Sequence, residues 1–216
     1  MDESRVKEMI SKIIRELNSD DTDKIIPVEA SAKHVHLCKE DVEKLFGKGY
    51  KLTPKRELSQ PGQFLCEERI NIMGPKGVIK NVAVLGPERG STQIEISKTD
   101  GISLGVNAPV RDSGDTKGSA DLFISAGKNI IKAEEAVIIA RRHIHMPPEA
   151  ADKFGLVDKD VVNVKILSDR PVIFEDVLIR VSEKYSLNMH IDFDEANACN
   201  LKKGTKGQIL NKKENI

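Results

Sequence analysis

The apolar positions of the chain change their spacing near residue 25. Before that point they recur every three or four residues, which predicts an amphipathic helix over residues 2–18. The positions that form this stripe are Val6, Ile10, Ile13 and Leu17. A polar, acidic stretch at 18–23 follows and is typical of a linker. Residues 1–20 are therefore predicted to form an N-terminal amphipathic helix that either packs on its own domain or docks a partner protein.

Beyond residue 25 the apolar residues fall into short runs broken by Gly and Pro, as is typical of β-strands. These runs are 26–28, 63–73, 77–85 and 92–97 in the first half, and 136–140, 160–167, 172–181 and 187–193 in the second. The sequence Gly74-Pro75-Lys76-Gly77 predicts a hairpin turn. Residues 98–134 are rich in turn formers and are expected to carry a crossover. The Lys-rich tail 201–216 is expected to fray.

Two segments about a hundred residues apart resemble each other. They read Ala32-Lys33-His34-Val35-His36-Leu37 and Arg141-Arg142-His143-Ile144-His145-Met146. A short helical pattern follows each of them. Such self-similarity predicts an internal duplication of a mostly β unit with short helices.

Each copy places two histidines two residues apart, and in an extended strand such residues point to the same face. A metal site built on two imidazoles needs at least one further ligand. The second hairpins of the two halves align at an offset of 95 residues, which lays Glu95 on His190. Two candidate metal sites result, His34/His36/Glu95 and His143/His145/His190, and together they use all five histidines.

This set of imidazole and carboxylate ligands suits Zn²⁺ best, although Fe²⁺, Co²⁺ and Mn²⁺ also accept it. Cys38 continues the alternation of His34 and His36 and is an alternative soft ligand; otherwise it is a small buried thiol. The other copy has Pro147 at that position, which cannot bind a metal through its side chain.

Composition excludes several classes of function. Lys plus Arg and Asp plus Glu both number 34, and Trp is absent, so we expect no nucleic-acid partner. The three cysteines are widely spaced, which favours a reducing cytoplasm over a disulfide scaffold. No apolar run is long enough for a membrane span or a signal peptide, so we expect no membrane partner. Neither a Walker loop nor a Gly-x-Gly-x-x-Gly signature is present.

An ordered set of motifs between about residues 27 and 200 closely resembles the PduL-type phosphate propanoyltransferases, the phosphotransacylases of bacterial microcompartments. The matching motifs are His-Val-His-Leu, Gln-Pro-Gly-Gln-Phe (60–64), Gly-Pro-Lys-Gly, Leu-Gly-Pro-x-Arg (85–89), Gln-Ile-Glu-Ile-Ser, Ala-Pro-Val-Arg-x-Ser-Gly, Arg-His-Ile-His-Met and Met-His-Ile-Asp-x-Asp-Glu-Ala-Asn (189–197).

The resemblance implies two β-barrel domains related by a pseudo-twofold axis, with a dinuclear zinc site between them. We accordingly expect a first barrel with its crossover over residues 25–134, a second barrel over 135–200 and a tail over 201–216. The first zinc would be held by His34, His36 and Glu95 and would take the coenzyme A sulfur. The second would be held by His143, His145 and His190 and completed by water.

The same resemblance places phosphate binding and catalysis on Arg89, and coenzyme A contacts on Ser31, Ala32, Lys76 and Asn197. Ala32 and Ala83 depart from the residues expected at their positions, so the coenzyme A contacts are expected to be fewer or rearranged. Without the resemblance, the alternative role of Arg89 is a surface ion pair with Glu88 or another carboxylate.

The implied reaction moves a propanoyl or acetyl group between coenzyme A and inorganic phosphate. The expected location is the cytoplasm, within the lumen of a bacterial microcompartment. The N-terminal helix would direct the enzyme there by binding shell proteins. No nucleophile with a spare histidine is evident, which favours direct attack by phosphate. Two alternatives remain: a dinuclear zinc hydrolase of acyl thioesters or amides, and a non-catalytic metal-binding scaffold. The sequence is compatible with a homo-oligomer and does not fix the acyl chain.

Overall fold

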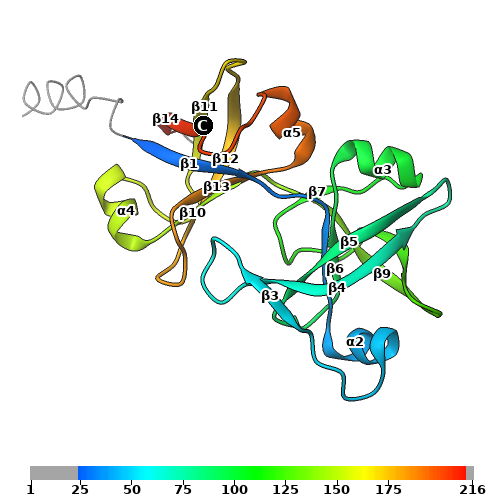
Figure 1. Ribbon diagram of the computed structural model, residues 1–216. Helices are drawn as coiled ribbons and strands as arrows, with labels where there is room; N and C mark the ends of the chain where they lie inside the picture. Colours follow the sequence, from blue (N-terminus) through cyan, green and yellow to red (C-terminus); the bar gives the residue numbers. More distant parts are fainter. Residues whose placement is uncertain (1–23, 213–216) are drawn as a thin grey trace, which may run out of the picture.

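Strands that alternate inward apolar and outward polar side chains close into two β-barrels that lie side by side (Figure 1). The computed structural model describes residues 24–212. Strand β4 (Phe64–Met73) illustrates the alternation, because Cys66, Ile70 and Ile72 are buried whereas Glu67 is exposed. The amphipathic helix expected over residues 1–20 lies outside the described residues.

Barrel one closes through a ring of six strands, in which β4 pairs with both β5 and β8. The ring runs β4, β5 (Val78–Gly86), β2 (His34–His36), β6 (Gln93–Glu95), β9 (Asn129–Ala140) and β8 (Ala120–Ala126). Two further strands extend its sheet, β3 (Pro54–Glu57) beside β4 and β7 (Val110–Arg111) beside β9. Its helices are α2 (Lys39–Phe46) and α3 (Lys98–Leu104).

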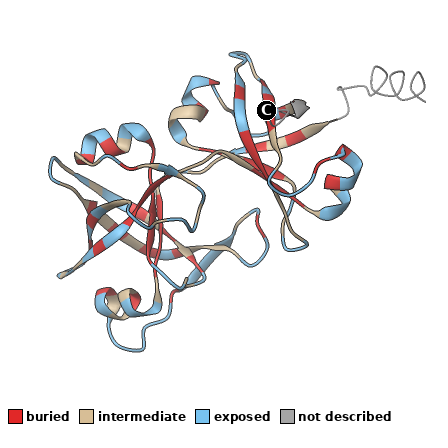
Figure 2. Ribbon diagram, turned by 180° about the vertical axis from the view of Figure 1, so that it is seen from behind, coloured by how far each residue is buried: buried red, intermediate tan, exposed pale blue. Residues whose placement is uncertain are grey.

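Barrel two is a second closed ring of six strands. In order, they are β1 (Ile25–Ala30), β13 (Asn188–Ile191), β10 (His143–Met146), β12 (Ile173–Val181), β11 (Val161–Leu167) and β14 (Lys206–Lys212). Its helices are α4 (Pro148–Phe154) and α5 (Phe193–Ala198). Each barrel encloses its own cluster of buried apolar side chains, and Figure 2 shows this burial inside both.

Strand register confirms the duplication and the offset of 95. In barrel one, His34 pairs with Ala83 across parallel strands and with Glu95 across antiparallel strands. In barrel two, His143 pairs in the same two ways with Leu178 and His190. The predicted hairpin is also present, because the Gly74 N–H donates to the Gly77 carbonyl between β4 and β5.

The structure corrects the expected domain division at three places. Strand β1 lies in barrel two, where Ile26 and Val28 are buried, although it precedes barrel one in sequence. The tail expected to fray instead supplies β14. Residues 98–134 contain α3, β7, β8 and part of β9 in addition to turns.

Both missed barrel strands have a physical explanation. In β14 the inward positions are Gly207 and Ile209, and the surrounding lysines mask this alternation. A Cβ on Gly207 would lie 2.8 Å from Val164 Cγ1, so only glycine allows this close approach. In β8 the buried Leu122 and Ile124 alternate with exposed side chains within a turn-rich region.

The chain crosses between the barrels twice, and each crossing leads directly into a His-x-His strand. Residues 31–33 connect β1 of barrel two to β2 of barrel one, and residues 141–142 connect β9 of barrel one to β10 of barrel two. The two His-x-His strands, β2 and β10, therefore start where the chain crosses between the barrels. Within residues 24–212, no helix is long and apolar enough to span a lipid bilayer.

Candidate functional site

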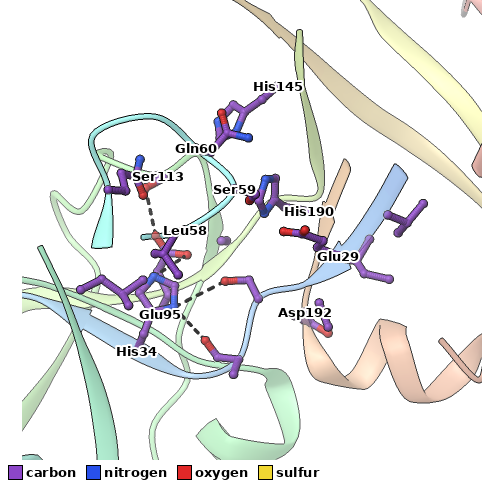
Figure 3. A pocket seen from close by; sticks show the side chains of 18 of the residues that line it. Glu29, His34, Leu58, Ser59, Gln60, Glu95, Ser113, His145, His190 and Asp192 are labelled. Atoms are coloured by element: carbon purple, nitrogen blue, oxygen red, sulfur yellow. Dashed lines mark hydrogen bonds and ion pairs between the residues drawn. The ribbon is translucent and has the colours of Figure 1, made fainter. Parts of the chain in front are cut away.

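A single cleft collects the histidines of both barrels. It is lined by His34, His36 and Glu95 from barrel one and by His143, His145 and His190 from barrel two. Figure 3 shows His34 and Glu95 on one side of it, with His145 and His190 further along. The six residues predicted as metal ligands thus line one cleft, although they come from four strands, β2, β6, β10 and β13.

The barrel-one triad forms a compact and buried donor set. One ligand atom each from His34, His36 and Glu95 can be chosen so that all three lie within 4.8 Å of one another. His34 Nδ1 lies 2.7 Å from the Ala32 carbonyl oxygen, which leaves Nε2 facing Glu95 Oε2 at 3.4 Å. His36 Nδ1 is buried without a hydrogen-bond partner. A tetrahedral metal ion with one open position fits this arrangement.

A network of hydrogen bonds holds the Glu95 carboxylate in place. Its Oε1 accepts from Ser113 Oγ at 2.9 Å and from Gln93 Nε2 at 2.6 Å. Gln93 is itself fixed, because its Oε1 accepts from the Gly114 N–H at 2.7 Å. Such outer contacts orient ligands and raise the affinity of a metal site.

The electrostatics of this triad favour a bound cation. Burial alone would raise the pKa of Glu95, but the charge and hydrogen bond of His34 hold it well below its usual range. Burial would lower the pKa of His34, yet Glu95 raises it above its usual value. Burial and the charge of His34 lower the pKa of His36 to about 3. The site therefore offers a carboxylate and a neutral imidazole at pH 7.

The barrel-two histidines repeat this arrangement with three imidazoles. Their ring centroids lie 4.7 Å apart for His143 and His145, 5.4 Å for His143 and His190, and 5.0 Å for His145 and His190. His143 Nδ1 lies 2.8 Å from the Arg141 carbonyl oxygen, as His34 does from Ala32. His145 Nδ1 and His190 Nε2 are buried and unpartnered. Among the described residues, only the barrel-one triad brings its ligand atoms within 4.8 Å, so the second zinc stays a prediction.

Arg89 lies in the cleft and is linked to the first triad. Its Nη1 donates to Ser113 Oγ at 3.3 Å, and Ser113 donates to Glu95. Burial lowers the pKa of Arg89. Within residues 24–212 it forms no ion pair, so the alternative pairing with Glu88 does not occur there. A guanidinium without a carboxylate partner is available to bind an anion.

The residues expected to contact coenzyme A fall into two groups. Ser31 and Ala32 line the cleft, and Ser31 Oγ lies 3.5 Å from His34 Nδ1. Lys76 lies in the β4–β5 turn against Gly105, and Asn197 lies in α5; neither lines the cleft. Their proposed contacts stay predictions.

Cys38 does not join the barrel-one triad among the described residues. It precedes α2, and its Sγ lies 3.5 Å from Thr92 Oγ1, outside the cleft that holds the histidines. The alternative of Cys38 as a metal ligand therefore has no support in this geometry.

Sequence reasoning missed several polar residues of the site. Ser113 and Gln93 lie in motifs that it singled out, and Gln93 shares a strand face with Glu95 because it lies two residues earlier. Arg180 and Tyr185 also line the cleft. Arg180 is the register partner of His145 on a neighbouring strand, and no motif of the sequence analysis contains it.

Comparison with known proteins identifies the family of the chain. A family model described as phosphate propanoyltransferase matches residues 27–202. A phosphate propanoyltransferase of Clostridioides difficile is 50% identical over 207 residues, which cover 96% of each chain. One of Listeria monocytogenes is 54% identical over 187 residues, covering 87% of this chain and 88% of the relative. One of Thermotoga maritima is 54% identical over 180 residues, covering 83% and 86%. The chain therefore belongs to the phosphate propanoyltransferase family of acyltransferases.

Proposed function

We propose that the protein transfers a short acyl group, propanoyl or acetyl, between coenzyme A and inorganic phosphate, so that acyl-CoA and phosphate give acyl phosphate and coenzyme A. The observation that carries this proposal is the hydrogen-bonded chain from Arg89 through Ser113 to Glu95, which ties an unpaired guanidinium to the metal triad within one cleft. The printed names of the relatives support the propanoyl group as the acyl substrate.

We propose two zinc ions per chain, one held by His34, His36 and Glu95 and the other by His143, His145 and His190. Three observations support them: the compact first triad, the clustered rings of the second and the buried unpartnered nitrogens in both. When bound, zinc supplies a Lewis acid that polarises the thioester carbonyl and stabilises the leaving thiolate.

The protein's own residues position phosphate and exclude an acyl-enzyme. Arg89 presents a planar fork to the phosphate oxygens. A phosphate oxygen then attacks the thioester carbonyl carbon, the C–S bond breaks and coenzyme A leaves as its thiolate. Ser31 lacks a base, because the nearby His34 Nδ1 is already 2.7 Å from the Ala32 carbonyl. Ser113 is engaged by Glu95, Gln93 and Arg89. Holding the reactants in line supplies much of the rate.

The test measures release of coenzyme A thiol from propanoyl-CoA by zinc-loaded protein, with and without phosphate, beside a His36→Ala variant. We expect release that requires phosphate and disappears in the variant. Release without phosphate would indicate the hydrolase alternative instead. Bound zinc with no release under either condition would indicate the non-catalytic scaffold.

We also propose that residues 1–20 direct the enzyme into a bacterial microcompartment by docking on shell proteins. The apolar stripe of this segment supports the proposal. Deleting residues 1–20 is expected to keep activity and abolish co-sedimentation with shells. Co-sedimentation that survives the deletion contradicts it.

A further inference from the structure

Arg180 lines the cleft from the barrel opposite Arg89. It is the register partner of His145 on the neighbouring parallel strand, so the two side chains share a sheet face. Its guanidinium carbon lies 5.8 Å from the ring centroid of Tyr185, and the Tyr185 ring stacks on His145 at 4.2 Å. Arg180 is therefore held beside the second histidine cluster by an aromatic contact.

No carboxylate in residues 24–212 forms an ion pair with Arg180. Its positive charge acts on the centre of the site. After burial, this charge is one of the causes that lower the pKa of Arg89 and the pKa values of the three barrel-two histidines. Arg89 and Arg180 thus both line the cleft without a carboxylate partner, one from each barrel. An arrangement that costs charge repulsion is explained when an anion binds between the two.

The duplicated barrel carries a different residue at the equivalent place. At the offset of 95 residues, Arg180 corresponds to Leu85, which also lines the cleft. The backbone frame is the same in both barrels, since His34 pairs with Ala83 as His143 pairs with Leu178. At this position barrel one thus presents an apolar side chain to the cleft where barrel two presents a cation.

We propose that Arg180 binds the phosphate group that is transferred, as inorganic phosphate in one direction and as acyl phosphate in the other, on the side opposite Leu85. Arg89 and Arg180 then hold the same group from two barrels, and Leu85 packs against the acyl chain. The proposal rests on the proposed phosphotransacylase function. Arg180 would bind the oxygens of a phosphate group. Coenzyme A also carries phosphate groups, and the test separates these from the transferred phosphate.

The test compares zinc-loaded wild type with Arg180→Met, Arg180→Lys and the control Lys184→Met. Methionine keeps an apolar stem without charge, and Lys184 is exposed and does not line the cleft. Steady-state kinetics gives KM separately for phosphate and for propanoyl-CoA. Titration calorimetry with inorganic phosphate alone gives binding without turnover. Thermal melting and zinc content establish that each variant is folded and loaded.

For Arg180→Met we expect KM for phosphate, and the dissociation constant of phosphate, to rise about tenfold or more, the loss of a charge-assisted contact. KM for propanoyl-CoA should change less than twofold. Arg180→Lys should recover part of the loss, and Lys184→Met should match wild type.

Three results overturn the proposal. A rise confined to KM for propanoyl-CoA assigns Arg180 to a phosphate of coenzyme A. Unchanged kinetics and phosphate binding in a folded Arg180→Met variant assign it no substrate. If Arg180→Met loses zinc or unfolds, and Arg180→Lys does the same, the role of Arg180 is structural. Failure of the proposed function looks different, because wild type would then show no phosphate-dependent release of thiol.

Discussion

Arg142 donates from Nη1 to Glu195 Oε1 at 2.6 Å, and this ion pair joins a barrel crossing to the helix beside the second histidine cluster. Glu195 also caps α5, because its Oε2 accepts from the Asp192 N–H. Barrel one repeats the pattern, with Lys33 Nζ 2.9 Å from Asp100 Oδ1 in the capping box of α3. The crossings that lead into His34 and His143 are thus each held by a carboxylate that also caps a helix.

Glu195→Gln should weaken metal binding at the second cluster. The amide keeps a neutral acceptor for Arg142 but loses the charge, so the crossing that orients His143 is held less firmly. We expect about tenfold lower affinity for the second zinc and a loss of about 1 kcal/mol in the free energy of unfolding. Competition with a chelating dye and urea unfolding measure the two effects. The exposed Glu183→Gln serves as the control, and equal affinity in both variants would count against the role.

Gln60→Ala should weaken the contact between the two barrels. The buried Gln60 side chain donates to the Ser186 carbonyl at 3.0 Å and accepts from the Ser186 N–H at 3.2 Å, so it bridges barrel one to the β12–β13 loop. Loss of these two part-buried bonds is expected to cost about 1 to 3 kcal/mol of stability, at roughly 0.5 to 1.5 kcal/mol for each bond. Urea unfolding measures it against Ser59→Ala in the same loop. A stability equal to that control would show that the bridge contributes nothing.

Metal stoichiometry should separate the two clusters. Glu95→Gln replaces the only carboxylate of the barrel-one triad and leaves barrel two unchanged. His190→Ala does the reverse. We expect each variant to retain about one zinc per chain where wild type holds two, and the double variant to hold none. Elemental analysis after gel filtration gives the ratio. A wild-type content of one zinc, lost entirely in Glu95→Gln, would reduce the centre to a single metal.

Acid should destabilise the protein when chelator has removed any metal. Burial lowers the pKa of His145 to about 2 and that of His190 to about 3, whereas an unfolded chain keeps them near ~6.5. The unfolded state therefore binds more protons below pH ~6.5, so stability is present above this pH and lost as the pH falls toward 3. Each histidine contributes at most about 1.4 kcal/mol per pH unit.

The measurement is urea unfolding in chelator at pH 7.5 and pH 5. His145→Gln cannot titrate at this position, so its loss of stability on acidification should be smaller than that of wild type. His34 acts in the opposite sense, because Glu95 raises its pKa despite burial. Equal stability at both pH values would contradict the prediction.

The histidine motifs were sufficient to locate the site in the sequence. A period of two places His34 and His36 on one face, and the offset between the halves identifies Glu95 opposite His190, as strand register confirms. The alternation depends on local spacing and the offset on the internal duplication, and both can be read from the sequence without knowing which strands pair. The mainly β class likewise follows from short apolar runs.

Other parts of the fold depend on contacts that spacing does not reveal. Strand β1 joins barrel two because it pairs with β13 and β14, both far away in sequence. Strand β14 is recognised only when Gly207 is seen to face the crowded Val164. Arg180 enters the site through its pairing with His145. In each case the partner strand decides the role, and local residue preferences carry no information about it.

The exchange of strands between the barrels implies that the fold tolerates circular permutation. Strands β14 and β1 lie antiparallel, with Ile25 beside Gln208, and occupy in barrel two the places that the β8–β9 hairpin occupies in barrel one. Joining residue 212 to residue 24 by a short turn would recreate that hairpin. Opening the chain at Gly127–Lys128 would then make barrel two continuous and barrel one discontinuous. The same cleft would form, because the position of the chain ends is the main topological difference between the two halves.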